Sequence, residues 1–347
     1  RATSSPTSTG RATSTSGSRP GGRGCPAKTF VLPGSAAPPT AYERTGGQFD
    51  GAAQGGFFAH PMVAGLDEVM DWPAVADPAN PAHGRLWSMI GATLAGRGVV
   101  EGHGAGLRDA ARLNAFSAAG LASDHEAATA QEAWDKLTRG IFLQVRPQSV
   151  GEIVGGLLAR GLTDWSQVAL VTDDRPAWDT LSLGATDNNL RLAIEAGLSP
   201  EVALRLVTLN PARHMRLTPW AGSLARGRFA DIVLMDDPAT VSIADVWADG
   251  RCVAEGARYT GPLPHVARPE RVTASIRIGR RLTADDFRIP AAEGRETTRA
   301  AEFRPFHWAD DFLVEELPVA DGAVQRDAAR AVTKLGVVDR HGHGGAV

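Results

Sequence analysis

The chain has 347 residues, a length that suits one large domain or two smaller ones. Hydrophobic residues make up 43% of it and charged residues 22%, so it can bury a sizeable core. The net charge is −3 and Lys and Arg are scattered, which argues against nucleic acid or a membrane surface as a partner. The two cysteines, Cys25 and Cys252, are far apart, which argues against a disulfide framework or a thiolate zinc site. No run approaches the roughly 18 apolar residues of a membrane span, and no signal-peptide core is present, so we expect a cytoplasmic protein.

Residues 1–27 consist almost entirely of Ser, Thr, Arg, Gly, Pro and Ala and hold little that could be buried. We therefore expect a disordered, low-complexity tail; translation of this stretch out of frame is the alternative. From Lys28 onward, short apolar runs alternate with helical patterns. Strands are expected over 28–33, 62–69, 98–103, 120–126, 141–147 and 167–174.

Helices are expected between and after these strands, over 128–140, 150–161, 185–197 and 199–215. Thr129 is placed to cap the first of them, and Ser199 followed by Pro200 the last. Strands that alternate with helices indicate parallel strands joined by crossover helices, which is the α/β fold class.

The pattern changes near Gly222, where short strands and Gly or Asp turns over 222–256 indicate a small β-subdomain. Another β-rich region begins at about Pro264. We therefore expect an α/β region over 28–215, a small β-subdomain over 216–263 and a further β-rich region over 264–347.

Polar side chains gather where the expected strands end. Glu68, His103 and His125 end three successive strands, and Arg146 and the pair Asp173–Asp174 end the two that follow. In parallel α/β folds that edge of the sheet carries the active site. Imidazole nitrogen and carboxylate oxygen together suit a divalent metal of borderline hardness.

Each of these residues also has a simpler interpretation. A histidine at a strand end is usually structural, and Asp173 and Asp174 could cap the next helix. Glu101 and Glu126 could be solvated, and Arg146 could pair with a neighbouring carboxylate. The remaining histidines are interpreted as structural or as part of a flexible tail: His60, His83, His214, His265, His307, His341 and His343. Four residues of metal-ligand type (Glu68, His103, His125 and Asp173) at the same end of four strands favour a metal site nevertheless.

Several segments together resemble the adenine deaminases of the amidohydrolase superfamily. They are Gly-Leu-Asp-Glu-Val (65–69), Val-Glu-Gly-His-Gly-Ala-Gly-Leu (100–107), Ala-Ser-Asp-His-Glu (122–126), Phe-Leu-Gln-Val-Arg (142–146) and Leu-Val-Thr-Asp-Asp-Arg (170–175). The stretch 222–237, with Ala-Asp-Ile-Val-Leu, is similar to the closing signature of the superfamily. Segments 282–290 and 334–342 resemble parts of the family's C-terminal domain.

The resemblance implies a distorted (β/α)₈, TIM-like barrel and a metal-dependent hydrolysis of adenine to hypoxanthine and ammonia. It implies that Glu68, His103, His125 and Asp173 bind a divalent metal, Mn²⁺ or Fe²⁺ with Zn²⁺ as the alternative. Glu68 and Asp173 would also act in catalysis, Asp173 by moving a proton. Glu126, Arg146 and Asp174 would contact the substrate. The implied partner is the small molecule adenine, with a homo-oligomer left open.

The superfamily places a His-x-His pair on its first barrel strand, and no such pair precedes Lys28. The resemblance therefore implies a chain truncated at both ends, with a partial barrel over 28–215, a β-sandwich return segment over 216–263 and the start of the family's C-terminal domain over 264–347. The barrel is incomplete because a whole one needs eight strands and about 250 residues. Two other functions stay open: a cyclic amidohydrolase or aminopurine deaminase of different specificity, and a non-catalytic remnant that binds metal, purine or an intact subunit.

Overall fold

The computed structural model describes residues 49–338, except 61, 257, 262–266, 275, 295, 303–312, 331, 335 and 337. These residues divide between 261 and 267 into two compact units, each of which is described by itself. The expected tail over 1–27, the strand expected over 28–33, and His265, His307, His341 and His343 lie outside the described residues.

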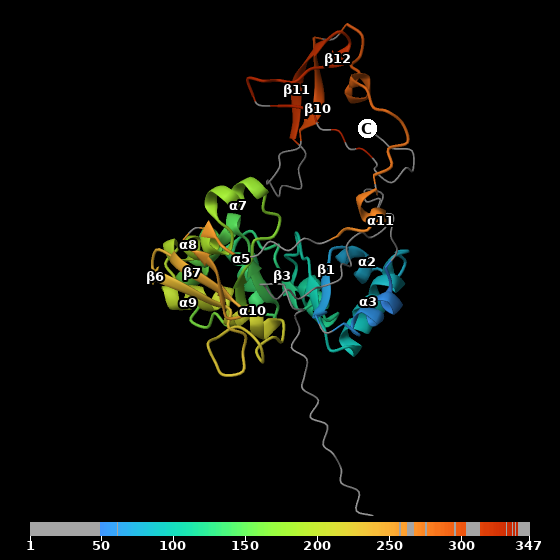
Figure 1. The fold of residues 1–347 in the computed structure, drawn as a ribbon. Helices are drawn as coiled ribbons and strands as arrows, with labels where there is room; N and C mark the ends of the chain where they lie inside the picture. The colour runs from blue at the N-terminus through green and yellow to red at the C-terminus, as the bar shows by residue number, and fades with distance from the viewer. Residues whose placement is uncertain are drawn as a thin grey trace, which may run out of the picture. The chain divides into compact units, whose positions relative to one another are not determined.

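Five parallel strands form the centre of the first unit (Figure 1): β1 (Gly65–Val69), β2 (Val99–Gly102), β3 (Ser123–Asp124), β4 (Phe142–Val145) and β5 (Val168–Leu170). They adjoin in chain order, β1 with β2, and β3 with β4 with β5. A backbone hydrogen bond from Ala122 N to Val100 O, 2.8 Å long, joins the second strand to the third. All five were expected from the sequence, and their parallel order confirms the α/β class.

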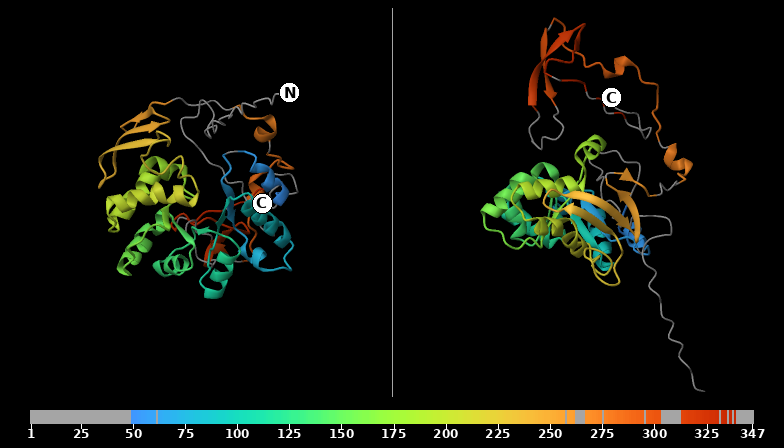
Figure 2. Two further views of the ribbon diagram at one scale, coloured as in Figure 1. Left: turned by 90° about the horizontal axis from the view of Figure 1, so that it is seen from below. Right: turned by 60° about the vertical axis from the view of Figure 1, so that its left-hand side comes forward.

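Helices precede, connect and follow these strands, and several of them pack against the strands (Figures 1 and 2). They are α1 (Gly51–Phe57), α2 (Trp72–Ala76), α3 (His83–Ala95), α4 (Ala110–Ala118), α5 (Ala130–Leu137), α6 (Val150–Ala159), α7 (Ala177–Leu183), α8 (Thr186–Glu195), α9 (Pro200–Val207) and α10 (Leu209–His214). A short 3₁₀ turn over Pro147–Ser149 leads into α6. The Thr129 side chain accepts a hydrogen bond from Glu132 N, and Ser199 from Val202 N, so both predicted helix caps are confirmed.

The helix expected over 199–215 is two helices, because the chain breaks at Thr208 (φ −128°, ψ −79°). Pro211 explains the break. A proline inside a continuous helix would clash with the carbonyl four residues earlier, whereas the first turn of a new helix tolerates it. The break also turns α10 so that the Asn210 amide donates to Trp165 O and Val168 O, which ties this helix to the strand β5.

Two apolar clusters support the arc of strands from its two ends. One joins β1 and β2 to α2, α3 and α4, with Leu66, Met89 and Phe116 fully buried. The other joins β4 and β5 to α5, α6, α8 and α9, with Leu143, Ile153 and Leu206 fully buried. Parallel strands that are covered on both faces read as apolar runs, which is why they were visible in the sequence.

Antiparallel sheets follow the parallel strands. β6 (Ile232–Asp237), β7 (Ser242–Ala248), β8 (Arg251–Glu255) and β9 (Arg258–Tyr259) form a four-stranded sheet in chain order, at the place where a small β-subdomain was expected. The second unit holds α11 (Glu270–Thr273), a 3₁₀ turn (Ala284–Phe287) and a three-stranded sheet of β10 (Thr297–Glu302), β11 (Leu313–Ala320) and β12 (Ala323–Val324). The β-rich character expected after Pro264 is therefore found in the described part of that region.

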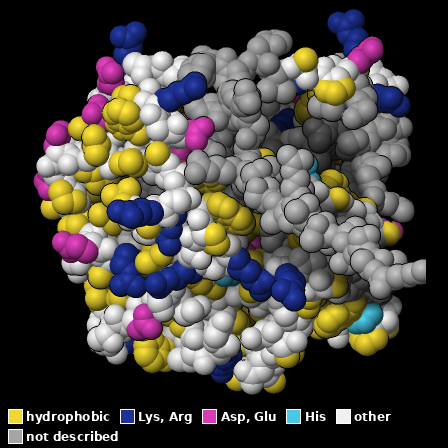
Figure 3. Space-filling view, turned by 60° about the horizontal axis from the view of Figure 1, so that its bottom comes forward, with side chains coloured by type: hydrophobic (Ala, Val, Ile, Leu, Met, Phe, Trp, Pro, Cys, Tyr) yellow, Lys and Arg dark blue, Asp and Glu magenta, His cyan; other side chains and the backbone are white. Residues whose placement is uncertain are grey.

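The surface is mixed in chemistry. Figure 3 shows acidic, basic and apolar side chains interspersed over one face, in keeping with a net charge of −3. Among the helices of the described residues, none is long and apolar enough to cross a membrane.

Candidate metal centre

Glu68 reaches the edge of the sheet through an irregularity in β1. Gly65 and Leu66 pair with Val99 and Val100, but the next pair is Val69 with Gly102. Three residue steps on β1 therefore face two on β2, so the strand carries one extra residue, a β-bulge, at Asp67 and Glu68. Successive strand residues normally point to opposite faces, yet both of these carboxylates line the same cavity. The bulge accounts for that.

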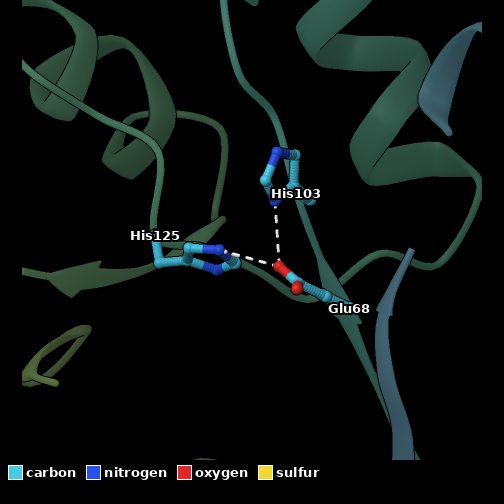
Figure 4. A group of neighbouring side chains, drawn as sticks. All are labelled: Glu68, His103 and His125. Carbon is cyan, nitrogen blue, oxygen red and sulfur yellow. Dashed lines mark hydrogen bonds and ion pairs between the residues drawn. The ribbon is translucent and has the colours of Figure 1, made fainter. Parts of the chain in front are cut away.

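Glu68 lies between two imidazoles from the next two strands (Figure 4). Its Oε2 is 2.9 Å from His103 Nδ1 and 2.8 Å from His125 Nε2. The two rings are 5.1 Å apart between centroids and inclined at 75°. One donor atom from each of the three residues lies within 4.8 Å of the others. The structure thus brings together three of the four residues for which a ligand role was predicted.

The electrostatics of this group are strongly coupled. Burial alone would raise the pKa of the Glu68 carboxyl, but hydrogen bonds and charge from His103 and His125 outweigh it and lower the pKa to about 2. Burial alone would lower the pKa of His125, but the hydrogen bond to Glu68 and the nearby carboxylates raise it above its usual 6.5. In the metal-free protein the Glu68 carboxylate thus stabilises the protonated His125 ring, and a metal cation bound to these donors would take the place of that positive charge.

Asp173 belongs to a second group, with His125 and Glu126. Asp173 Oδ1 lies 4.0 Å from His125 Nε2, and Glu126 Oε1 lies 3.4 Å from the same nitrogen. Arg146 binds both carboxylates: it donates to Glu126 through two nitrogens at 2.6 and 3.2 Å, and to Asp173 Oδ2 at 2.9 Å. Glu126 and Arg146 are almost fully buried, so the interpretation of Glu126 as solvated was wrong. His125 is shared by the two groups.

Asp173 adopts a left-handed backbone conformation, with φ of 49°. The helix that follows, α7, begins after Pro176 and has no side-chain cap, so the alternative in which Asp173 or Asp174 caps the next helix was wrong. Asp174 is exposed and belongs to neither group of metal-ligand type in the described chain. Its contact with substrate stays a prediction.

A cavity of about 390 Å³ opens beside these groups. Ligand pockets in proteins begin at about 300 Å³, so it has room for a small molecule. It is lined by Asp67, Glu68, Glu101, His125, Gln144, Val171, Asp173 and Met215.

Glu101 and His214 form a network in and under this cavity that sequence reasoning missed. Glu101 Oε1 lies 2.6 Å from His214 Nε2, and Oε2 accepts from Gln144 at 2.8 Å and from Ser123. Burial acts to raise the pKa of Glu101, and the hydrogen bond from His214 reverses this, so that the pKa is lowered. Glu101 was interpreted as solvated, which was wrong. Its place inside an apolar strand was the available signal, because a carboxylate there needs a partner.

The donor set of Glu68, His103 and His125 fits a divalent metal. Catalytic sites commonly offer three protein ligands of nitrogen and oxygen type and leave a position for water. Here three such donors come from three adjacent strands, close to one another and beside a cavity. Asp173 and Glu126 add carboxylate oxygens near the same His125 nitrogen that Glu68 contacts.

Metal binding at this centre is expected to depend on pH through His125. Its imidazole must be neutral to bind a metal, and its pKa is raised above 6.5. In the metal-free protein, protonated His125 stabilises the fold below pH 6.5 and loses that effect as the pH rises through its folded pKa. Mn²⁺ affinity should therefore rise about tenfold per pH unit below that pKa and level off above it. Calorimetric Mn²⁺ titrations from pH 5.5 to 8.5 test this, and a constant affinity would contradict it.

Comparison with known proteins shows what the chain is similar to. The amidohydrolase family model matches residues 152–254. The chain is 62% identical over 318 residues to adenine deaminase 2 of Jannaschia sp. (strain CCS1), covering 91% of this chain and 51% of that protein. It is 58% identical to adenine deaminase 1 of Bradyrhizobium sp. (strain ORS 278), covering 94% and 52%. It is 34% identical to adenine deaminase of Moorella thermoacetica, covering 94% and 55%.

The chain therefore spans about half the length of the curated relatives it matches. By sequence, the chain is similar to adenine deaminases over more than nine tenths of its own length, and residues 152–254 match the amidohydrolase family model.

Proposed function

We propose that the chain carries the catalytic metal centre of an adenine deaminase, which converts adenine and water to hypoxanthine and ammonia. The observation that carries the proposal is the Glu68 carboxylate between two imidazoles at 2.8 and 2.9 Å, with Asp173 beside them at a cavity. The names of the relatives support adenine as the substrate. We further propose that the site takes Mn²⁺ or Fe²⁺, with Zn²⁺ as the alternative, and that the parallel strands belong to a TIM-like barrel.

A divalent ion held by Glu68, His103 and His125 would lower the pKa of water and supply a nucleophile near neutral pH. Asp173 Oδ1 faces His125 and serves as the proton carrier. This oxygen accepts a proton from the attacking water and passes it to the amino group, which leaves the ring carbon as ammonia. Glu68 keeps the two imidazoles oriented.

Arg146 and Glu126 serve in this proposal as positioning residues. Both Glu126 oxygens accept from Arg146, which fixes the guanidinium. Arg146 in turn holds Asp173 Oδ2 and leaves Oδ1 toward His125. The resemblance implies that Arg146 and Glu126 contact the substrate. Because they contact each other and Asp173, we propose instead that they orient Asp173.

The experiment that tests the proposal measures bound metal by mass spectrometry and ammonia release from adenine in the same preparation. We expect at least one divalent ion per chain and release of ammonia at a rate that depends on it. Ammonia from another aminopurine, or ring opening of a cyclic amide, without turnover of adenine would favour a different amidohydrolase. A chain with neither metal nor turnover would be a non-catalytic remnant. The matched control is the Asp173→Asn variant, which should keep its fold and lose turnover by about 10²–10⁴-fold.

A further inference from the structure

We propose that the buried ion pair of Asp124 and Lys136 is a positioning device that sets the spacing of His103 and His125. This inference deepens the proposed function. Its consequence for metal binding rests on that function. The spacing itself is a property of the metal-free chain. Asp124 ends β3, next to His125, and Lys136 lies in the last turn of α5. Their side chains are 0% and 1% exposed, and Lys136 Nζ lies 2.6 Å from Asp124 Oδ2.

The pair contacts both loops that carry the imidazoles. On the His103 side, Asp124 Oδ1 accepts from Gly104 N, and Lys136 Nζ donates to Gly104 O at 3.3 Å. On the His125 side, Asp124 Oδ2 accepts from Glu126 N at 3.0 Å. The residue that follows each imidazole is therefore held by the same carboxylate.

The contact between Gly104 and Asp124 depends on the absence of a side chain at position 104. A Cβ built on Gly104 would lie 2.7 Å from Asp124 Oδ1, closer than real Cβ atoms come to other atoms. Any other residue at 104 would therefore push the carboxylate away from the loop. The absence of a side chain is what lets the main chain after His103 close onto Asp124.

Stability alone does not explain the pair. Moving two charges out of water is costly, and a buried ion pair is often no more stable than well-packed apolar residues of the same volume. What an apolar pair does not supply is the set of three hydrogen bonds to main-chain atoms of the two loops. Those bonds are directional, so they fix where the loops lie relative to each other. Metal ligands must be held within about 0.5 Å of their productive positions.

The test separates positioning from stability with a double variant. Lys136→Met or Asp124→Asn alone leaves an unpaired buried group and should lower the melting temperature. Asp124→Asn with Lys136→Met removes both charges and should recover most of that temperature. If the pair positions the imidazoles, the double variant should still bind Mn²⁺ at least about tenfold more weakly than the unaltered chain, as the loss of residues that orient ligands does elsewhere.

Gly104→Ala provides a second variant that changes no charge, should the charge variants fail to fold. It should weaken Mn²⁺ binding in the same direction. Arg108→Met is the matched control: it breaks a 2.6 Å ion pair to Glu132 between the same loop and the same helix but touches neither Gly104 nor Glu126. Its Mn²⁺ affinity should equal that of the unaltered chain.

A measurement on the metal-free chain keeps the result independent of the proposed function. The ring ¹H and ¹³C resonances of His103 and His125, assigned by substitution, report their contact with Glu68. They should shift toward free-imidazole values in the Gly104→Ala chain and in the double variant, and stay unchanged in Arg108→Met. Unshifted resonances in both altered chains, or Mn²⁺ affinities within twofold of the unaltered chain, would overturn the positioning role. A failure of the unaltered chain to bind Mn²⁺ would instead contradict the proposed function.

Discussion

Substituting Gln for Glu68 is expected to lower the affinity of the chain for Mn²⁺ by at least about 100-fold. Loss of a residue that only hydrogen-bonds to a metal ligand costs up to about 100-fold, and Glu68 is itself a proposed ligand. The Gln side chain keeps the shape of Glu68 but removes the negative charge between the two imidazoles. Because Glu68 is the main cause of the raised pKa of His125, that pKa should fall toward or below 6.5 in the variant. Calorimetry gives the affinity, and a ¹H NMR titration of the His125 ring gives the pKa.

Asp67→Asn is the matched control for this substitution. Asp67 precedes Glu68 in the same bulge and lines the same cavity, but it belongs to neither group of metal-ligand type in the described chain. Its variant should bind Mn²⁺ as the unaltered chain does. A Glu68→Gln chain with unchanged affinity would remove Glu68 from the ligand set.

Arg146→Met is expected to lower the free energy of unfolding of the metal-free chain by about 3–5 kcal/mol, the usual cost of removing one partner of a buried ion pair. Glu126 would keep its charge in a buried place without the two hydrogen bonds that now offset it. The Asp173 side chain is 23% exposed, so the loss of its bond to Arg146 should cost less free energy. Urea unfolding followed by tryptophan fluorescence measures the change, since Trp165 is buried in the neighbouring apolar cluster.

Two further variants test the cause of that loss. Glu126→Gln combined with Arg146→Met should regain part of the free energy, because it removes the unpaired charge. Arg191→Met breaks an ion pair with Asp187 whose side chains are 34% and 29% exposed, and exposed pairs of this spacing are worth about 0.3–0.5 kcal/mol. If Arg146→Met and Arg191→Met lower the free energy of unfolding equally, burial does not increase the contribution of the Arg146 pair to stability.

The placement of the metal-type residues could be predicted because one topological rule governs it. Parallel strands end at the same edge, so Glu68, His103, His125 and Asp173 had to lie near one another once the strands were located. The rule predicts the edge of the sheet at which these side chains lie, but it does not predict which of them contact one another. The division of Asp173 from Glu68 into separate groups around His125 required the structure.

The contacts of the supporting residues could not be predicted, because the partners are remote in sequence or lie where their residue type is unusual. His214 meets Glu101 across 113 positions of sequence, and no spacing connects them. Lys136 lies in an amphipathic helix, where a lysine normally indicates the solvent face, yet it points inward to Asp124. The helix break at Thr208 was available from Pro211, whose effect on a continuous helix is general.

The backbone of Asp173 limits which amino acids can replace it. At φ of 49°, the main chain readily accepts Gly, Asn or Asp and disfavours longer side chains. Proton transfer at the same place needs a carboxylate. Aspartate meets both demands best, because glutamate supplies the carboxylate but is less favoured in this backbone conformation. Asparagine and glycine fit the backbone, and each is one nucleotide change away from aspartate. A lineage that lost the chemistry by such a change would keep the backbone conformation at this position, so the fold alone would not distinguish an inactive descendant from an active one.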